Sequence, residues 1–322
     1  MIFALAITGP TASGKTAISI ELSKRLGCEI ISCDSMQIYR GMDIGTAKAT
    51  ADERAAVPHH LIDFLSPSEG YSVERYRAEA LSCVKDISSR GKIPLFVGGT
   101  GLYIDSVMRP SANDSPIGSP EKRVELARQA EEPGGVDRLY ERLCAVDPES
   151  AALTHKNNLK RVIRALEIFE LTGKPKSYFD KLSREARSDI SVGMITLDFH
   201  DRENLYRRVD ERVDIMINDG LVEETRRLLR YYPHLSSTAS QAIGYKELMP
   251  YLDGRETLDE AVEKIKLSSR RYAKRQLTWF RHEQDAKKLF VDGEDGKIKD
   301  KEQIINEALE LAKDFLNSNK SE

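Results

Sequence analysis

Short apolar runs alternate with longer amphipathic stretches through the first third of this 322-residue chain. Apolar runs at residues 2–7, 29–33 and 93–97 predict buried strands, and residues 17–26 and 72–90 have the periodicity of amphipathic helices. Strands that alternate with helices are typical of a parallel sheet covered by helices. The pattern therefore predicts an α/β fold for this part of the chain.

The pattern changes near residue 109. Residues 110–120 are rich in Pro, Ser, Gly, Asn and Asp, which favour loops, and residues 121–181 then show helical periodicity only. A further buried strand is expected at residues 192–197. We therefore predict a catalytic core of residues 1–110 and 190–322, interrupted by a small all-helical insertion domain at residues 111–189.

Three helices are expected after the insertion. The first spans residues 201–219 and ends before Gly220. The second starts at a capping box, Thr257 with Glu260, and runs past Trp279. The third, at residues 302–316, has an apolar stripe that predicts packing against the core.

A glycine-rich loop follows the first predicted strand. It reads Gly9-Pro10-Thr11-Ala12-Ser13-Gly14-Lys15-Thr16 and matches the pattern GxxxxGK followed by Ser or Thr. In such a loop the backbone N–H groups and the helix N-terminus converge on a phosphate, the lysine reaches an outer phosphate, and the hydroxyl binds Mg²⁺. A turn without a ligand is disfavoured, because strand, loop and helix occur in the order that phosphate binding requires. We expect a P-loop NTPase-like sheet that binds a polyphosphate through Lys15, with Mg²⁺ at Thr16.

Polar residues also follow the other two predicted strands. Asp34 comes after the second strand, and Thr100 lies within Gly98-Gly99-Thr100-Gly101 after the third. Because ligands bind beyond the carboxyl ends of parallel strands, both should lie near the P-loop. Asp34 then becomes a general base or a Mg²⁺ ligand rather than only a turn or cap residue, and Thr100 can donate a hydroxyl as well as cap a helix. Gln37 offers a donor and an acceptor to a base edge.

Basic residues cluster although the net charge is −3. The stretch 264–281 contains seven Lys or Arg residues, three aromatic residues and no acidic one. Helical spacing places two sets of basic residues on one face each: Lys266, Arg270 and Lys274, and in the insertion Lys156, Lys160 and Arg164. Most charge runs are solvated faces of balanced sign, so these unbalanced ones indicate a nucleic-acid backbone as partner. Arg207-Arg208 is a candidate phosphate clamp.

Composition disfavours several classes of protein. A hydrophobic content of 40% supports a packed core, and no apolar run approaches the ~20 residues of a membrane span. The four cysteines form no CxxC pair, which argues against a zinc ribbon and a secreted disulfide framework. No second strand of the hhhhD type supplies a Walker B aspartate, which disfavours a motor ATPase. We expect a cytoplasmic monomer without a membrane partner.

Seven segments of the chain occur together in one known family. They are GPTASGKT, DSMQIY, GGTGLY, NNLKRVIRALEIFELTGKP, LYRRVDERVDIMINDGLVEE, QAIGYKEL and RRYAKRQLTWFR. In these segments and their order the chain resembles the bacterial-type tRNA dimethylallyltransferases, also called tRNA isopentenyltransferases. The resemblance covers about residues 4–282.

The resemblance implies a reaction. A dimethylallyl group would pass from dimethylallyl diphosphate to N6 of the adenosine 3′ of the anticodon, in tRNAs that read codons starting with U. It implies that Lys15, Thr16 and Mg²⁺ hold the diphosphate, with Arg208 as a further contact. It also makes Asp34 the general base and places Thr100 at the leaving-group side of the reaction channel.

The resemblance also implies contacts with the tRNA anticodon stem-loop. The residues are Asp34, Ser35, Met36, Gln37, Thr100, Arg123, Lys160, Arg161, Val162, Ile163, Arg164, Ala242, Ile243, Gly244, Tyr245, Lys246 and Glu247; the basic stretch adds Arg271 and Arg275. At Lys160 and Glu247 the family often has Gln, so their individual roles are less fixed.

Three alternatives remain open on the residues alone. An adenylate isopentenyltransferase would use the same donor with free AMP or ATP as acceptor, but would not need the basic tracks. A P-loop small-molecule kinase would share the loop and Mg²⁺ and leave the stretch 264–281 unexplained. A nucleic-acid-binding NTP switch would leave Asp34 and Thr100 without a role.

Overall fold

The chain forms two compact units. The structure, a computed structural model, describes residues 2–108, 118–185, 190–283 and 285–320. The core unit consists of Met1–Met108 and Asp189–Glu322, and the insertion unit of Arg109–Ser188. Most of the loop expected at residues 110–120 lies outside the described residues.

The core unit is built on a parallel sheet. Its six described strands are β1 (Ile2–Thr8), β2 (Cys28–Ser32), β3 (His59–His60), β4 (Ile93–Gly98), β5 (Ile190–Asp198) and β6 (Lys287–Phe290). They lie in the order β3-β2-β4-β1-β5-β6, and all five neighbouring pairs are parallel. The four predicted strands are the four longest, and the α/β fold is confirmed. The edge strands β3 and β6 were missed because two and four residues are too few to show a period.

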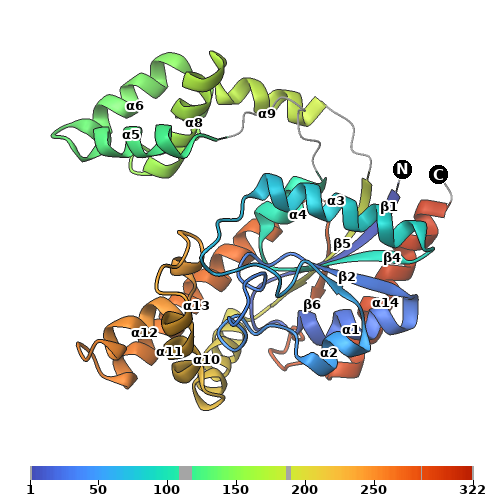
Figure 1. Cartoon of the computed structure of the whole chain (residues 1–322). Coiled ribbons are helices and arrows are strands. Elements are labelled where there is room, and N and C mark those ends of the chain that lie inside the picture. Colours follow the sequence, from blue (N-terminus) through green and yellow to red (C-terminus); the bar gives the residue numbers. More distant parts are fainter. Residues whose placement is uncertain (1, 109–117, 186–189, 284, 321–322) are drawn as a thin grey trace. The chain divides into compact units, whose positions relative to one another are not determined.

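Alternate strand residues pack on opposite faces of the sheet. The flanking helices are α1 (Lys15–Leu26), α2 (Ala51–Ala56), α3 (Val73–Ser89), α4 (Gly101–Met108) and α14 (Lys301–Lys320). Ala4 and Ala6 belong to the core under α3 and α4, whereas Leu5 and Ile7 belong to the core with α1 and α14 (Figure 1). Because both faces are covered, the strands read as continuous apolar runs.

A second group of helices follows β5. It comprises α10 (Arg202–Asn218), α11 (Leu221–Tyr231), the 3₁₀ turn η1 (Ala239–Gln241), α12 (Tyr245–Leu252) and α13 (Leu258–Arg281). Figure 1 shows α10 to α13 side by side, and α13 packs against both α10 and α12. The predicted capping box of Thr257 and Glu260 starts α13, which then runs for 24 residues.

The insertion unit is helical throughout its described residues. Its helices are α5 (Pro120–Glu131), α6 (Gly135–Val146), α7 (Pro148–Ala152), α8 (Leu159–Thr172) and α9 (Lys176–Glu185). Leu126, Leu143 and Leu166 are fully buried in a core of its own. Among the described helices of either unit, none is both long and apolar enough to cross a membrane.

Candidate active site and nucleic-acid interface

The P-loop joins β1 to α1 in a conformation that glycine permits. Gly9 and Gly14 have φ angles of 136° and 97°, and a side chain at Gly9 would lie 2.8 Å from the carbonyl oxygen of Leu197. The Ser13 hydroxyl donates to the carbonyl of Pro10 at 2.8 Å and closes the loop on itself. The free N–H groups of the first turn of α1 therefore face the loop, which makes an anion site.

Lys15 lies in this loop with its charge poorly compensated. Its ammonium group donates to the carbonyl oxygens of Gly9 and Pro10, at 3.0 and 2.6 Å. The pKa of Lys15 is lowered to about 7 by burial and by the charge of Arg212, against the opposing effect of Asp34. A bound anion would supply the missing countercharge and favour the protonated form.

Thr100 and the segment that starts at Asp34 lie together at the carboxyl ends of adjacent strands. The N–H of Thr100 donates to the carbonyl of Cys33 at 3.1 Å, and the Thr100 hydroxyl accepts from the N–H of Ser35 at 3.2 Å. The structure thus brings Asp34 and Thr100 to one edge of the sheet, beside the P-loop strand β1.

The two carboxylate oxygens of Asp34 have different surroundings. Oδ1 accepts from the N–H groups of Met36 and Gln37, at 2.8 and 3.3 Å, which is the turn role weighed above. Within the described part of the chain, Oδ2 has no hydrogen-bond partner. The Gln37 amide nitrogen donates to the carbonyls of Thr46 and Ala47, at 3.1 and 3.3 Å. Gln37 therefore has only its oxygen left for a base edge, an acceptor and not the expected donor-acceptor pair.

Two arginines of α10 complete the cationic side of the site. The guanidinium of Arg208 donates to the carbonyl of Ala12 at 2.9 Å, so this side chain lies at the P-loop. Arg212 was missed, although it follows Arg208 by one helical turn. Burial lowers the pKa of Arg212, and the charge of Asp34 opposes that shift. Arg212 interacts electrostatically with both Arg208 and Lys15, so three cations lie together at the P-loop with Asp34 near them.

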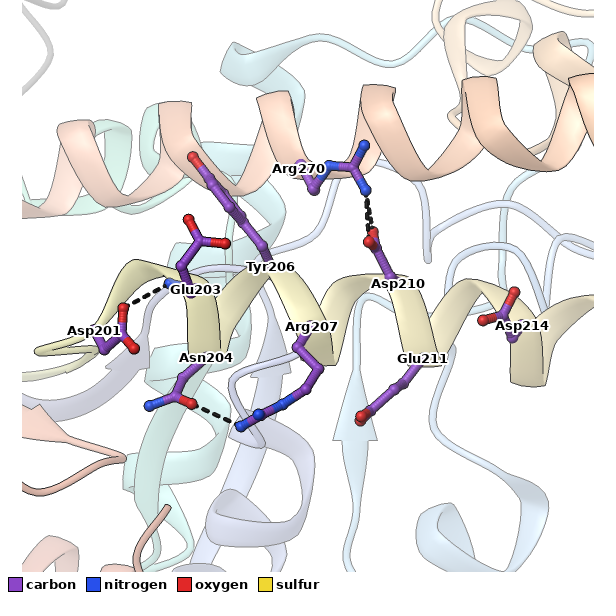
Figure 2. A pocket seen from close by; sticks show the side chains of 9 residues that line it. All are labelled: Asp201, Glu203, Asn204, Tyr206, Arg207, Asp210, Glu211, Asp214 and Arg270. Carbon is purple, nitrogen blue, oxygen red and sulfur yellow. Dashed lines mark hydrogen bonds and ion pairs between the residues drawn. The ribbon is translucent and has the colours of Figure 1, made fainter. Parts of the chain in front are cut away.

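Arg207 does not belong to this site, contrary to the predicted clamp. It donates to the side-chain oxygen of Asn204 at 2.7 Å and lines a separate pocket between α10 and α13 (Figure 2). Adjacent helical residues point in directions about 100° apart, so Arg207 and Arg208 cannot both reach the P-loop.

The inner face of α13 also reaches the site. Gln276 is buried and bonds to both loops, accepting from the N–H of Thr11 and donating to the carbonyl of Gly99, each at 2.9 Å. Burial raises the pKa of Tyr272, as does the charge of Asp34, while the neighbouring side chains of Thr100 and Gln276 oppose that rise as donors to its phenol oxygen. Sequence reasoning read Tyr272 only as part of a basic, aromatic surface and missed Gln276.

Strand β5 ends in an aspartate, although Thr196 interrupts its apolar run. The run Met194-Ile195-Thr196-Leu197-Asp198 lies next to β1. Both oxygens of Asp198 are bound by Arg281, at 3.0 and 2.7 Å, and Oδ1 also accepts from the N–H of Phe199. Asp198 is therefore engaged in holding the end of α13 against β5.

The residues at the P-loop suit Mg²⁺ shared with a diphosphate. Among the described residues, no group of three or more His, Cys, Asp or Glu side chains can enclose a metal ion. Mg²⁺ usually takes one or two protein oxygens together with phosphate oxygens and water. The Thr16 hydroxyl, in the first turn of α1, is such an oxygen.

Only part of the basic stretch on α13 is free to bind phosphate. Four of its seven cations have carboxylate partners: Lys264 with Glu256, Lys266 with Asp214, Arg270 with Asp210 and Arg281 with Asp198. The predicted face of Lys266, Arg270 and Lys274 is therefore largely an ion-pair seam to α10 (Figure 2). Across the residues described, Arg271, Lys274 and Arg275 form no ion pair and are exposed. Arg275 lies over the ring of Tyr272, 5.6 Å from its centroid.

Buried side chains remove some of the RNA contacts expected at residues 242–247. Ala242, Tyr245 and Glu247 are buried, because this segment packs the start of α12 into the core unit. The Tyr245 hydroxyl donates to Glu224 at 2.6 Å, and Glu247 accepts from the N–H of Gly244 at 2.8 Å. Lys246 keeps an exposed side chain.

The RNA contacts predicted in the insertion are likewise partly buried and partly exposed. Val162 and Ile163 are buried in the core of that unit, on the apolar face of α8, so their side chains cannot contact RNA. Lys160 and Arg161 are exposed.

Two further arginines of the insertion share one buried carboxylate. Arg123 and Arg164 both bind Glu167, at 2.9 and 2.7 Å, and this carboxylate also accepts from the N–H of Ser119. Charge-assisted bonds of this kind fix the guanidinium groups in place.

Comparison with known proteins agrees with this geometry. The model of the IPP transferase family matches residues 37–283, and that of the isopentenyl transferase family matches residues 2–71. The chain belongs to the tRNA dimethylallyltransferase family. A tRNA dimethylallyltransferase of Thermoanaerobacter sp. (strain X514) is 48% identical over 287 residues, which cover 89% of this chain and 91% of the relative.

Two solved members of the family show the same fold. The tRNA isopentenylpyrophosphate transferase of Bacillus halodurans is 41% identical, with a TM-score of 0.73, and the match covers 100% of this chain and 99% of that one. A eukaryotic dimethylallyltransferase acting on tRNA is 29% identical, with a TM-score of 0.82, covering 99% of this chain and 80% of that one. Family membership thus extends over the whole chain and includes both units.

Proposed function

We propose that this protein transfers a dimethylallyl group from dimethylallyl diphosphate to N6 of the adenosine 3′ of the anticodon, in tRNAs that read codons starting with U. The observation that carries the proposal is the juxtaposition of the P-loop cations Lys15, Arg208 and Arg212 with the carboxylate of Asp34. One side of the site is suited to a leaving diphosphate and the other to a proton.

The cationic side stabilises the departing group. As the exocyclic nitrogen bonds to the allylic carbon, the carbon–oxygen bond breaks and its electron pair leaves with the diphosphate. The N–H groups of the P-loop and the cations of Lys15 and Arg208 are already in place where this negative charge develops. Mg²⁺, held at Thr16, would neutralise further charge on the diphosphate oxygens. Thr100 lies on the leaving-group side of the channel.

Asp34 takes the proton that the adenosine amine loses. Oδ1 is held by the N–H groups of Met36 and Gln37, and that bonding orients Oδ2 for the amine. An adenine amine is a weak nucleophile, so a positioned carboxylate contributes only if the base is aligned. The base must leave its stack to reach the site, which is easier in an unpaired anticodon loop than in a duplex.

Apart from Asp34 and Thr100, which we assign to the chemistry, the RNA contacts that we propose are the exposed and half-buried members of the predicted set. In the core unit they are Ser35, Met36, Gln37, Ile243, Lys246, Arg271 and Arg275; in the insertion they are Lys160, Arg161, Arg123 and Arg164. The four cysteines are free, which fits a reducing compartment, so we place the enzyme in the cytoplasm as a monomer.

A competition assay tests the acceptor. The protein is incubated with labelled dimethylallyl diphosphate, Mg²⁺ and unmodified tRNA, with AMP and ATP present at equal concentration. We expect label in the tRNA and none in the nucleotides. Label in AMP or ATP but not in tRNA would instead show an adenylate isopentenyltransferase.

A further inference from the structure

Helix α13 presents different residues to solvent and to the active site. Arg271 and Arg275 are exposed, whereas Tyr272 and Gln276 point into the site. One rigid element therefore connects the proposed RNA surface with the loops that surround the diphosphate.

Gln276 has both ends of its amide bound to these loops. Its oxygen accepts from the N–H of Thr11 in the P-loop, and its nitrogen donates to the carbonyl of Gly99, each at 2.9 Å. The side chain is 5% exposed, so neither bond has water as a ready substitute. The Gln276 amide packs directly against Gly99, since a Cβ atom at Gly99 would lie 2.0 Å from the Gln276 nitrogen.

The two loops bound by Gln276 contain the proposed diphosphate-binding residues and the proposed catalytic residue Thr100. Thr11 belongs to the P-loop that follows β1, and Gly99 directly precedes Thr100 on the loop that follows β4. The strands β1 and β4 are neighbours, but the only side chain described as hydrogen-bonded to the backbone of both loops is Gln276. Thr100 in turn accepts from Ser35, next to Asp34. A chain of short contacts thus runs from the P-loop through Gln276 to the proposed general base.

We propose that Gln276 is a positioning residue that transmits occupancy of the P-loop to the loop of Thr100 and to α13. The inference rests on the proposed function, in which the P-loop holds a diphosphate. When the anion orders the P-loop, the bond from Thr11 holds Gln276, and Gln276 fixes Gly99 and with it Thr100. A displacement of about 1 Å at a reacting group can lower the rate about 10²-fold, so this link affects turnover more than donor binding.

The chain contains its own reporter of this link. Trp279 is the only tryptophan, is 37% exposed and lies one turn beyond Gln276 on α13. Its indole nitrogen lies only 2.3 Å from where a side chain at Gly101 would start, so the ring covers the loop of Thr100. A shift of this loop or of α13 should change the environment of Trp279 and its emission.

The test measures Trp279 emission and heat of binding during titration of the full chain with inorganic diphosphate and Mg²⁺. Two variants alter the link: Gln276→Met removes both bonds, and Gln276→Glu keeps the acceptor for Thr11 but loses the donor to Gly99. The matched control is Gln303→Met, because Gln303 is an exposed glutamine of α14 that bonds only to Glu307.

We expect diphosphate to bind to all four proteins with affinities within about threefold, measured by calorimetry. The emission change should be present in the unmodified protein and in Gln303→Met, and lost in both Gln276 variants. In prenyl transfer, the Gln276 variants should lose about tenfold to 10²-fold in kcat, with a smaller change in KM for the donor. A full emission response in Gln276→Glu would overturn the proposal, and so would an unchanged kcat.

The outcomes separate this inference from the proposed function. An emission response that depends on Gln276 in a protein that prenylates no tRNA would reject the function and leave the link intact. Prenylation of tRNA with an emission response that is the same in every variant would reject the link alone.

Discussion

At the scale of single residues, we propose that Asp34 uses its two oxygens for two different tasks. Oδ1 holds the turn that follows β2, and Oδ2 faces the site without a described partner. The sequence presented these tasks as alternatives, a cap or a base. In the structure the first task fixes Oδ1 and leaves Oδ2 for the second, which we propose.

Replacing the base should separate chemistry from binding. In Asp34→Asn the amide oxygen can still accept from Met36, but the side chain cannot take a proton. We expect kcat to fall by about 10²- to 10⁴-fold while the Kd for a tRNA anticodon stem-loop stays within about twofold. Single-turnover kinetics and a binding titration measure the two quantities. An equal loss in both would mean that Asp34 serves recognition and not proton transfer.

The lowered pKa of Lys15 predicts that diphosphate affinity depends on pH. This pKa is about 7, and a diphosphate would favour the charged form. Below pH 7 the lysine is already protonated. As pH rises above 7, the empty enzyme holds Lys15 neutral, so diphosphate binding must take up a proton and the affinity must fall.

Calorimetry in buffers with different ionisation enthalpies measures that proton. At pH 8 we expect the native protein to take up more protons per diphosphate than Lys15→Arg, because arginine is always charged. Diphosphate ionisation contributes equally to both proteins and cancels in the difference. Equal uptake by the two would contradict the assignment of Lys15.

At the scale of elements, the local features of α13 were predictable from the sequence, whereas its long-range contacts were not. Its capping box, length and basic composition were predictable from local spacing. The partners of Lys266 and Arg270 were not, since Asp214 and Asp210 lie on α10, more than fifty residues earlier in the chain. The links of Gln276 to two loops were equally hidden, because a glutamine in a helix has no local pattern that reveals a long-range contact.

The free and paired cations of α13 should behave differently. Arg271→Ala and Arg275→Ala should weaken RNA binding and reduce the slope of log Kd against log salt by about 0.7 each, the value for a contact to a single strand. Lys264→Ala, which removes a cation of α13 paired with Glu256 just before the helix, is the control and should leave the slope unchanged. If the slope for Arg271→Ala and for Arg275→Ala equals that of the native protein, then these residues of α13 do not contact the RNA backbone.

At the scale of the whole molecule, we propose that the two units have different roles. The P-loop pattern and the sheet-edge residues predicted where the proposed diphosphate site lies in the core unit, because the carboxyl ends of neighbouring parallel strands lie at one edge of the sheet. The role of Glu167 was not predictable, as its arginine partners come from two helices and the carboxylate looks like any surface charge in the sequence. It lies fully buried in the insertion unit.

Replacing Glu167 tests whether a change in the insertion unit affects RNA binding without affecting diphosphate binding. Glu167→Ala leaves Arg123 and Arg164 without their shared carboxylate. We expect it to lower the free energy of unfolding by about 1–3 kcal/mol, since the arginines are partly exposed, and to weaken RNA binding. Diphosphate binding should not change, because its residues all lie in the core unit. A loss of diphosphate affinity would contradict the division of roles.

We propose that the P-loop holds a group that departs and not one that is transferred. The most direct test uses dimethylallyl diphosphate with one label in the allylic carbon and another in phosphorus, incubated with Mg²⁺ and an unmodified anticodon stem-loop. We predict that the carbon label enters the RNA at the adenosine 3′ of the anticodon and that all phosphorus label is released as free diphosphate. Phosphorus label in the RNA, or phosphate transfer from ATP without prenylation, would contradict the account.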